Sequence, residues 1–249
     1  MNGYRSRLLG LLVATAAAIS TGFQPSDAAE PQASRPNLDG VWLPVAKASR
    51  LWPAERPFTK EMSARRAEWT KRTSPIDLTR DDEHISCLPY TLASMMITVT
   101  QYPIEIFTAP RRVYLLTETF GQVRRIELGS SPVSAEALPS RTGVSRERWE
   151  GDRLVVETRH ILPQHEGTRN PSSSQLRFEE RFSLQDAGDA GQHLINEITI
   201  TDPLVYTQPI QIRMAYRKAA PGVGIGEYVC NEDLWEQQRD GATSVIPWR

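Results

Sequence analysis

The sequence predicts a mainly β protein that folds as an antiparallel barrel or a strongly curved sheet, with one N-terminal helix. The first indication is the stretch 143–158, where two alternating polar and apolar segments flank Glu150-Gly151-Asp152. Glycine supplies the positive φ that such a hairpin turn needs. The second is a succession of about nine or ten strand-like segments at hairpin spacing. Consecutive antiparallel strands of this number close or curl strongly, and such a barrel has room for one small ligand.

The amino terminus has the pattern of a secretory signal peptide. Arg5 and Arg7 precede an apolar run over residues 8–19, and small residues follow up to Ala28. The run is too short to span a bilayer as a mature helix, so we expect a periplasmic or secreted protein. The predicted organisation is a signal peptide at 1–28, a flexible lead-in at 29–37 and a single β-barrel-like domain at 38–249.

The charge of the chain is balanced. Its 249 residues include 29 basic and 30 acidic ones, for a formal net charge of -1 at pH 7. A nucleic-acid partner requires a basic surface, and electrostatic docking on anionic lipid requires an excess of Lys and Arg. The balance argues against both. No later segment is long and apolar enough to insert into a membrane after signal cleavage.

Residues 58 to about 72 are the best helix candidate. Thr59 can cap the first turn, and Phe58, Met62 and Trp69 fall near one face. This pattern predicts a structural lid or a plug against a sheet.

From residue 92 the apolar period changes to two, which predicts strands. We expect a first strand at 38–42 and, from residue 92 onward, ten more at 97–100, 104–107, 113–118, 123–128, 143–149, 154–161, 175–184, 194–201, 210–216 and 226–230. A short helix is expected at 233–238.

Gly40 and Trp42 form a G-x-W motif on the first expected strand. This motif resembles the start of lipocalin-like barrels, in which the tryptophan closes the barrel floor. The resemblance implies an antiparallel, lipocalin-like barrel.

Over most of its mature length the chain is similar to a large, mostly uncharacterised family of exported bacterial proteins. The strongest shared stretch is W-E-G-D-x-L-V-V-x-T at 149–158. The other shared residues are 38–42, Cys87, Pro89, 102–106, Glu118, 122–126, 180–182, Asp202, Pro203, Tyr206, Thr207, Pro209, Glu227, Tyr228 and Cys230. The resemblance implies no particular activity. Relatives carry histidines where this chain has Val144 and the run 171–174, so a role of those histidines would be lost or changed here.

Two charged residues near the hairpin at 120–121 are the first candidates for chemistry. Period two places Glu118 and Arg125 on one face with Tyr114 and Leu116. If this face points inward, a desolvated ion pair lies among apolar groups. Because a buried ion pair contributes little to stability, its presence there would have to serve another purpose. If it points outward, the pair contributes under about 1 kcal/mol. The sequence leaves both orientations open.

Glu180 is the third candidate. Phe178 and Phe182 lie two residues before and after Glu180, so in a strand all three side chains point to the same face, which is aromatic. Glu179 points to the opposite face. A catalytic dyad of Glu179 and Glu180 is therefore excluded in a regular strand. We expect one interior that holds the candidates Glu118, Arg125 and Glu180 and a ligand site lined by Tyr114, Leu116, Trp149, Phe178 and Phe182.

We assign no metal site and no cofactor. His84 lies in an acidic stretch that reads equally as a solvated loop. His160 and His165 are separated by Pro163, which forbids the helical face that would align them as ligands.

Two functions remain open. The first is a small-molecule-binding protein with an apolar barrel pocket for an apolar or aromatic ligand, lined from six Trp, seven Tyr and six Phe. The second is an enzyme, a hydrolase, lyase or isomerase, that uses a carboxylate–Arg pair inside the same pocket. A structural role in envelope assembly would show instead as an exposed apolar patch.

Cys87 and Cys230 are the only cysteines. In an oxidising compartment an isolated pair indicates one disulfide, which here closes a very long loop and contributes about 4 to 5 kcal/mol in the chain-entropy model. The alternative, a catalytic thiol, needs a cysteine kept reduced beside a base, which export disfavours.

We predict that Cys87 and Cys230 are bridged in the exported protein. Thiol labelling of unfolded, unreduced protein is expected to attach no label, and labelling after reduction should modify both cysteines. Two labels per chain without reduction, one for each cysteine, would reject the disulfide.

Overall fold

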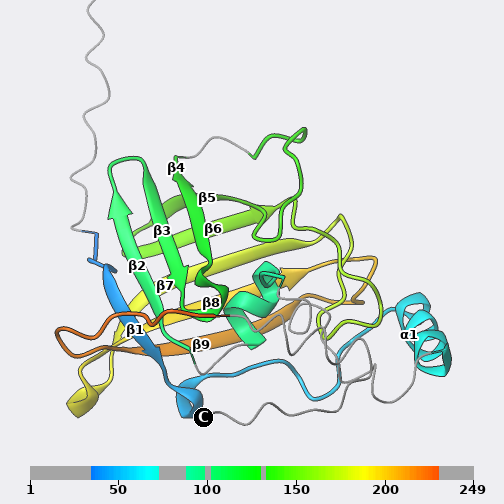
Figure 1. Cartoon of the computed structure of the whole chain (residues 1–249), viewed down its shortest axis with the longest axis horizontal. Coiled ribbons are helices and arrows are strands. Elements are labelled where there is room, and N and C mark those ends of the chain that lie inside the picture. The colour runs from blue at the N-terminus through cyan, green and yellow to red at the C-terminus, as the bar shows by residue number, and fades with distance from the viewer. Residues whose placement is uncertain (1–34, 73–87, 99–101, 130–132, 230–249) are drawn as a thin grey trace, which may run out of the picture. The chain divides into compact units, whose positions relative to one another are not determined.

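The chain folds into a closed barrel whose nine strands follow one another around the wall in chain order (Figure 1). The structure is a computed structural model that describes residues 35–72, 88–98, 102–129 and 133–229. The strands are β1 (Gly40–Pro44), β2 (Ile104–Ala109), β3 (Arg112–Thr117), β4 (Val123–Leu128), β5 (Val144–Glu150), β6 (Arg153–Arg159), β7 (Arg177–Asp186), β8 (Gln192–Thr201) and β9 (Ile210–Lys218). The expected mainly β, lipocalin-like barrel is confirmed.

One neighbouring pair departs from the expected antiparallel arrangement. β4 and β5 run parallel, with Ile126 opposite Ser145, whereas all the other neighbouring strands are antiparallel. A parallel pair needs a connection of about a dozen residues or more to bring the chain back to its starting end. The connection from β4 to β5 has that length, and Ser140 in it pairs with Ile161 beyond β6.

The barrel closes where β1 pairs with β9, with Trp42 opposite Lys218. The Trp42 side chain is buried, and its indole Nε1 donates a hydrogen bond to the Leu38 carbonyl at 2.8 Å. Lys218 Nζ lies 4.4 Å from the centroid of the Trp42 ring. The first strand is therefore held at the closure by a buried ring as well as by backbone pairing.

Helix α1 (Lys60–Arg72) confirms the expected N-terminal helix, although it begins two residues later than residue 58. The Thr59 side chain caps it, since its Oγ1 accepts a hydrogen bond from the Met62 amide at 3.1 Å. Trp69 on the helix lies against His165 of a loop, with ring centroids 4.7 Å apart and ring planes tilted by 40°, and Met62 is buried in the hydrophobic core. No helix of the described residues has the length and apolar character required to cross a membrane.

The strand expected at 97–100 is wrong for its described part, because Ser94–Thr98 forms a π-helix, labelled η2. Leu92, Met95, Met96 and Ile97 are all buried in the barrel's hydrophobic core. A short apolar run that is buried on every side has no face pattern by which a strand could be told from a helical turn.

Several expectations concern residues outside the described ranges. These are the signal peptide, residues 99–100, Cys87, Cys230 and the helix expected at 233–238. Residues 226–229 are described and have no regular secondary structure, so the strand expected there is not formed over them.

The turn between β5 and β6 has the conformation that the sequence indicates. Glu150 and Arg153 are the last paired residues, so Gly151 and Asp152 form a two-residue loop. Gly151 has φ 63°, and glycine at the first loop position is the signature of a type II′ hairpin turn.

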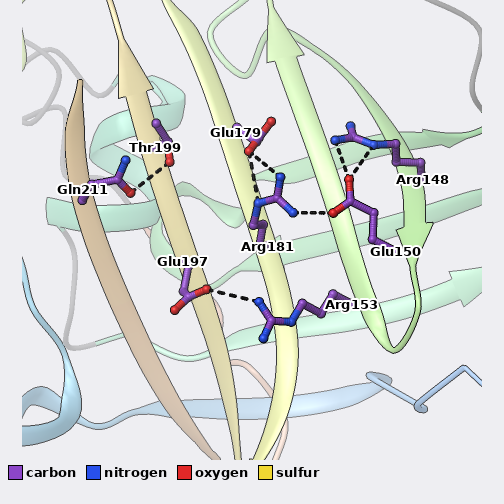
Figure 2. Close-up of polar contacts among 8 residues, drawn as sticks. All are labelled: Arg148, Glu150, Arg153, Glu179, Arg181, Glu197, Thr199 and Gln211. Carbon is purple, nitrogen blue, oxygen red and sulfur yellow. Dashed lines mark hydrogen bonds and ion pairs between the residues drawn. The ribbon is translucent and has the colours of Figure 1, made fainter. Parts of the chain in front are cut away.

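The outer face of the barrel carries a network of ion pairs on β5 to β8 (Figure 2). Arg181 lies between Glu150 on the neighbouring hairpin, at 2.5 Å, and Glu179 on its own strand, at 3.0 Å. Arg153 and Glu197 are 3.8 Å apart across β7. Because all of these groups are partly exposed, each pair contributes at most about 1 kcal/mol.

We predict that Gly151→Val lowers the free energy of unfolding by more than about 1 kcal/mol, because a β-branched residue resists positive φ. The space around the turn is open, with nothing within 4 Å of a Cβ at this position, so the cost comes from the backbone alone. Gly224→Val is the matched control, since Gly224 also has open space but no positive φ. Equal midpoints of urea unfolding for the two variants would show that residue 151 does not have the strained positive φ assigned to it.

Candidate functional site

A cluster of polar side chains lies inside the barrel, on the inward faces of five neighbouring strands. Its members are Arg124 on β4, Ser145 on β5, Thr158 on β6, Glu180 on β7 and Asn196 on β8. Only 1% of the Arg124 side chain and none of the Glu180 side chain is exposed. We call this group the interior polar cluster.

An ion pair between Arg124 and Glu180 is the centre of the interior polar cluster. Arg124 also donates from Nε to Ser145 Oγ at 3.1 Å and from Nη2 to Thr158 Oγ1 at 2.8 Å. Glu180 Oε1 accepts a hydrogen bond from Asn196 Nδ2 at 2.9 Å. The pair therefore joins β4 to β7 across the interior, and the neighbouring hydroxyl and amide groups partly replace the water lost on burial.

Other described residues do not use all the hydrogen-bonding capacity of this cluster. Arg124 Nη1 and Asn196 Oδ1 are buried without a hydrogen-bond partner, and Glu180 Oε2 has only its ion-pair contact. Each buried group left unsatisfied costs about 1 to 3 kcal/mol. The cluster can thus still offer the N–H groups of Arg124 Nη1 as donors, and the oxygens Asn196 Oδ1 and Glu180 Oε2 as acceptors, to another molecule.

Tyr216 on β9 adds a phenol next to this cluster. Burial raises the pKa of the Tyr216 hydroxyl, and the negative charge of Glu180 raises it further. The phenol therefore stays protonated at neutral pH and keeps its ability to donate a hydrogen bond.

A second buried carboxylate lies in the same row of the wall. Val156 on β6 is paired with Glu147 on one side and Glu180 on the other, so the two glutamate backbones are two strand spacings apart, about 10 Å. Glu147 is 5% exposed, and its Oε2 has no hydrogen-bond partner among the described residues. Burial raises the pKa of the Glu147 carboxyl, and the positive charge of Arg35 partly opposes this.

Trp149 follows two residues after Glu147, on the same inward face and close to the β5–β6 turn. Its ring is partly buried against the hydrophobic core. The Arg35 guanidinium carbon lies 5.3 Å from the ring centroid, a cation–π contact worth about 0.5 to 1 kcal/mol when exposed. We call Arg35, Glu147 and Trp149 the barrel-end cluster.

Apolar side chains surround both clusters. The fully or almost fully buried ones nearest in register are Leu154, Val156, Phe178, Phe182 and Ile198. The interior is therefore apolar around its wall but polar in its middle, which differs from the mostly apolar pocket that we expected.

Two surface clefts lie at loops and strand ends. One, of ≈ 570 Å³, includes Arg159, His160 and Arg177, and the other, of ≈ 510 Å³, includes His165 and Glu166. None of the residues that we expected to form the interior site lines either cleft.

The expected interior pair of Glu118 and Arg125 is wrong. Tyr114, Leu116 and Arg125 do share one face, with Tyr114 opposite Arg125 and Leu116 opposite Val123, but Arg125 is exposed and this face is the outer one. Glu118 lies beyond the end of β3, and its Oε2 accepts a hydrogen bond from the Gly226 amide at 2.8 Å. Tyr114 and Leu116 therefore do not line the interior.

The error has a physical reason. Both faces of β3 carry apolar residues, so its alternation separates two faces without showing which one is buried. The face that points inward carries Val113, Leu115 and Thr117. On β4 the inward residues are Arg124 and Ile126. The two are two residues apart, so the apolar Ile126 on the same face is the feature of the sequence that could have identified Arg124 as an inward residue.

The structure places Glu180, Phe178 and Phe182 inside the barrel, on one face, as their parity indicates. Trp149 is also inward but only partly buried. Their roles in binding or chemistry stay predictions. Sequence reasoning missed Arg124, Glu147 and Asn196, which all share parity with inward apolar neighbours on their own strands.

Among the described residues, no group of three or more His, Cys, Asp and Glu side chains is close enough together to hold a metal ion. His165 Nδ1 accepts a hydrogen bond from the Gly167 amide at 3.1 Å. His84 lies outside the described residues.

No protein-family model matches the chain, and no curated protein is significantly similar to it.

We predict that Arg124→Ala lowers the free energy of unfolding by about 3 to 5 kcal/mol, because it leaves Glu180 buried without a compensating charge. Replacing both partners, by Arg124→Met and Glu180→Leu, should recover most of this loss. Arg125→Ala is the matched control and should change stability by less than about 0.5 kcal/mol. Chemical denaturation checks all three. A double variant no more stable than the single one would contradict the pairing.

Proposed function

We propose that the protein binds a small molecule inside the barrel, a largely apolar or aromatic ligand held through a polar group. The observation that carries this proposal is the interior polar cluster, with buried hydrogen-bonding atoms of Arg124 and Asn196 that no described residue satisfies. The surrounding Leu, Val, Ile and Phe side chains suit an apolar ligand body.

Stability alone does not explain this cluster. A buried ion pair is typically no more stabilising than well-packed apolar residues of the same volume, and a partly satisfied polar network is worse. A ligand that accepts from Arg124 Nη1 and donates to Asn196 Oδ1 would remove the cost of both unsatisfied atoms. Recognition of such a ligand is therefore the simplest reason for charged groups in this interior.

The proposed setting is the periplasm or the extracellular space, on the strength of the signal-like residues 1–28. The family of exported bacterial proteins that the chain resembles is consistent with this setting. The balanced charge favours a small molecule over nucleic acid as the partner.

An enzyme that uses the same interior is the second candidate, and Glu147 is the observation that favours it. A buried carboxyl with a raised pKa, in the row of an ion-paired carboxylate, suits general acid–base chemistry in a hydrolase, lyase or isomerase. Incubation of a co-purified ligand with fresh protein discriminates the two functions. Conversion that is lost in Glu147→Gln supports an enzyme, and recovery of the ligand unchanged supports a binding protein.

We predict that native mass spectrometry of the full-length protein, purified from the periplasm of a producing cell, shows a bound small molecule. The same purification of the double variant, Arg124→Met with Glu180→Leu, should give folded protein without it. Arg125→Ala should retain it, because that side chain points outward.

The outcome that contradicts the proposal is specific. A double variant that keeps both its fold and the same bound molecule would make the Arg124–Glu180 pair structural only. Wild-type protein that carries no adduct, and gains no thermal stability from any member of a library of small apolar and aromatic compounds, would also reject ligand binding in the barrel.

A further inference from the structure

We propose that the barrel-end cluster is a subsite for a cationic group, in which Glu147 and Trp149 hold an ammonium or guanidinium group and Arg35 is its displaceable stand-in. This inference rests on the proposed function and deepens it, because it names the chemical class of the ligand. The cation would be bound at the end of the barrel near the β5–β6 turn.

The two receptor groups come from one strand. Glu147 and Trp149 are two residues apart on β5, so both project to its inward face. An aromatic face beside a carboxylate is the combination by which proteins bind quaternary ammonium and guanidinium groups. Trp149 is only partly buried, so the subsite can be reached from outside, whereas Glu147 behind it is 5% exposed.

A cation at this place would balance the charge of the buried Glu147 carboxylate. Arg124, the one buried arginine among the described residues, already forms an ion pair with Glu180 and is therefore not a partner for Glu147. Glu147 Oε2 has no hydrogen-bond partner among the described residues, and burial of a carboxylate oxygen without one is costly. A positive ligand group would pair with this oxygen.

The structure already contains a guanidinium at this place. Arg35 lies over the Trp149 ring, 5.3 Å from its centroid, and its positive charge acts on Glu147. Arg35 is itself exposed and precedes the buried Leu38 by three residues, so its side chain reaches the subsite from the lead-in to β1. An exposed cation–π contact is weak, so a cationic ligand group can compete with Arg35 for the Trp149 ring.

The test uses two pairs of probes on the mature protein, from which the expected signal peptide has been removed. Each pair contains a cation and a neutral molecule of the same shape, tetramethylammonium with tert-butanol and guanidinium with urea, all at low millimolar concentration. Binding is followed by the shift of the Trp149 indole N–H resonance, which is assigned by its disappearance in Trp149→Phe. We expect each cation to bind at least about tenfold more tightly than its neutral counterpart, a difference of about 1.4 kcal/mol.

Three variants separate the subsite from general charge effects. Arg35→Ala should strengthen cation binding by about two- to fivefold, since it removes the competing guanidinium. Glu147→Gln should abolish the preference for cations and, by removing a buried charge, raise the melting temperature. Glu136→Gln removes one exposed carboxylate and should change neither quantity.

Each result decides the inference. Equal binding of the cationic and neutral probes, or an affinity for cations that is unchanged or weaker in Arg35→Ala, would overturn the subsite and leave Arg35 as a structural cap. The proposed function survives that failure, because the bound molecule sought by mass spectrometry depends on Arg124 and Glu180. A bound molecule that is cationic, with its loss in Glu147→Gln, supports both proposals together.

Discussion

The pairing of β1 with β9 is the constraint on which the rest of the structure depends. It turns a nine-strand sheet into a closed wall, which leaves no free edge and divides every strand residue between an inside and an outside. Gly40, at the start of β1, has φ 118°, which favours glycine, and an added Cβ there would lie 2.7 Å from Nζ at the movable end of the Lys218 side chain. Because the interior is small, each inward position must be filled by a side chain or by a bound molecule.

Closure of the barrel also determines which charged side chains meet inside it. Arg124 and Glu180 come from strands that are separated by β5 and β6 in the wall, and they meet only because the sheet curls around them. Ser145, Thr158 and Asn196 satisfy part of their hydrogen-bonding capacity. The remainder is unsatisfied in an apolar setting, and this is the condition under which recognition of a polar ligand gains most from a low local dielectric.

Charged side chains on the outer face of the barrel interact more weakly than the buried pair, because they are exposed to solvent. Arg181, Glu150 and Glu179 form a network of short contacts, but water reaches all three side chains (Figure 2). Solvent screening makes such pairs weak, so they keep the outer face of the barrel wall polar and add little to its stability. The contrast explains why the buried Arg124–Glu180 pair, rather than the ion pairs on the surface, is the basis of the proposed function.

The sequence by itself determined the features that depend on near neighbours in the chain. Alternation showed that Phe178, Glu180 and Phe182 share a face, Gly151 indicated its turn, and Thr59 indicated the cap of α1. Only the tertiary structure decided which face of β3 and β4 points inward, and hence that Arg124 rather than Arg125 meets Glu180. It also decided that Arg35 lies beside Glu147 and Trp149. The reason is that local patterns divide a strand into two faces, whereas burial of one of them depends on how distant strands close around it.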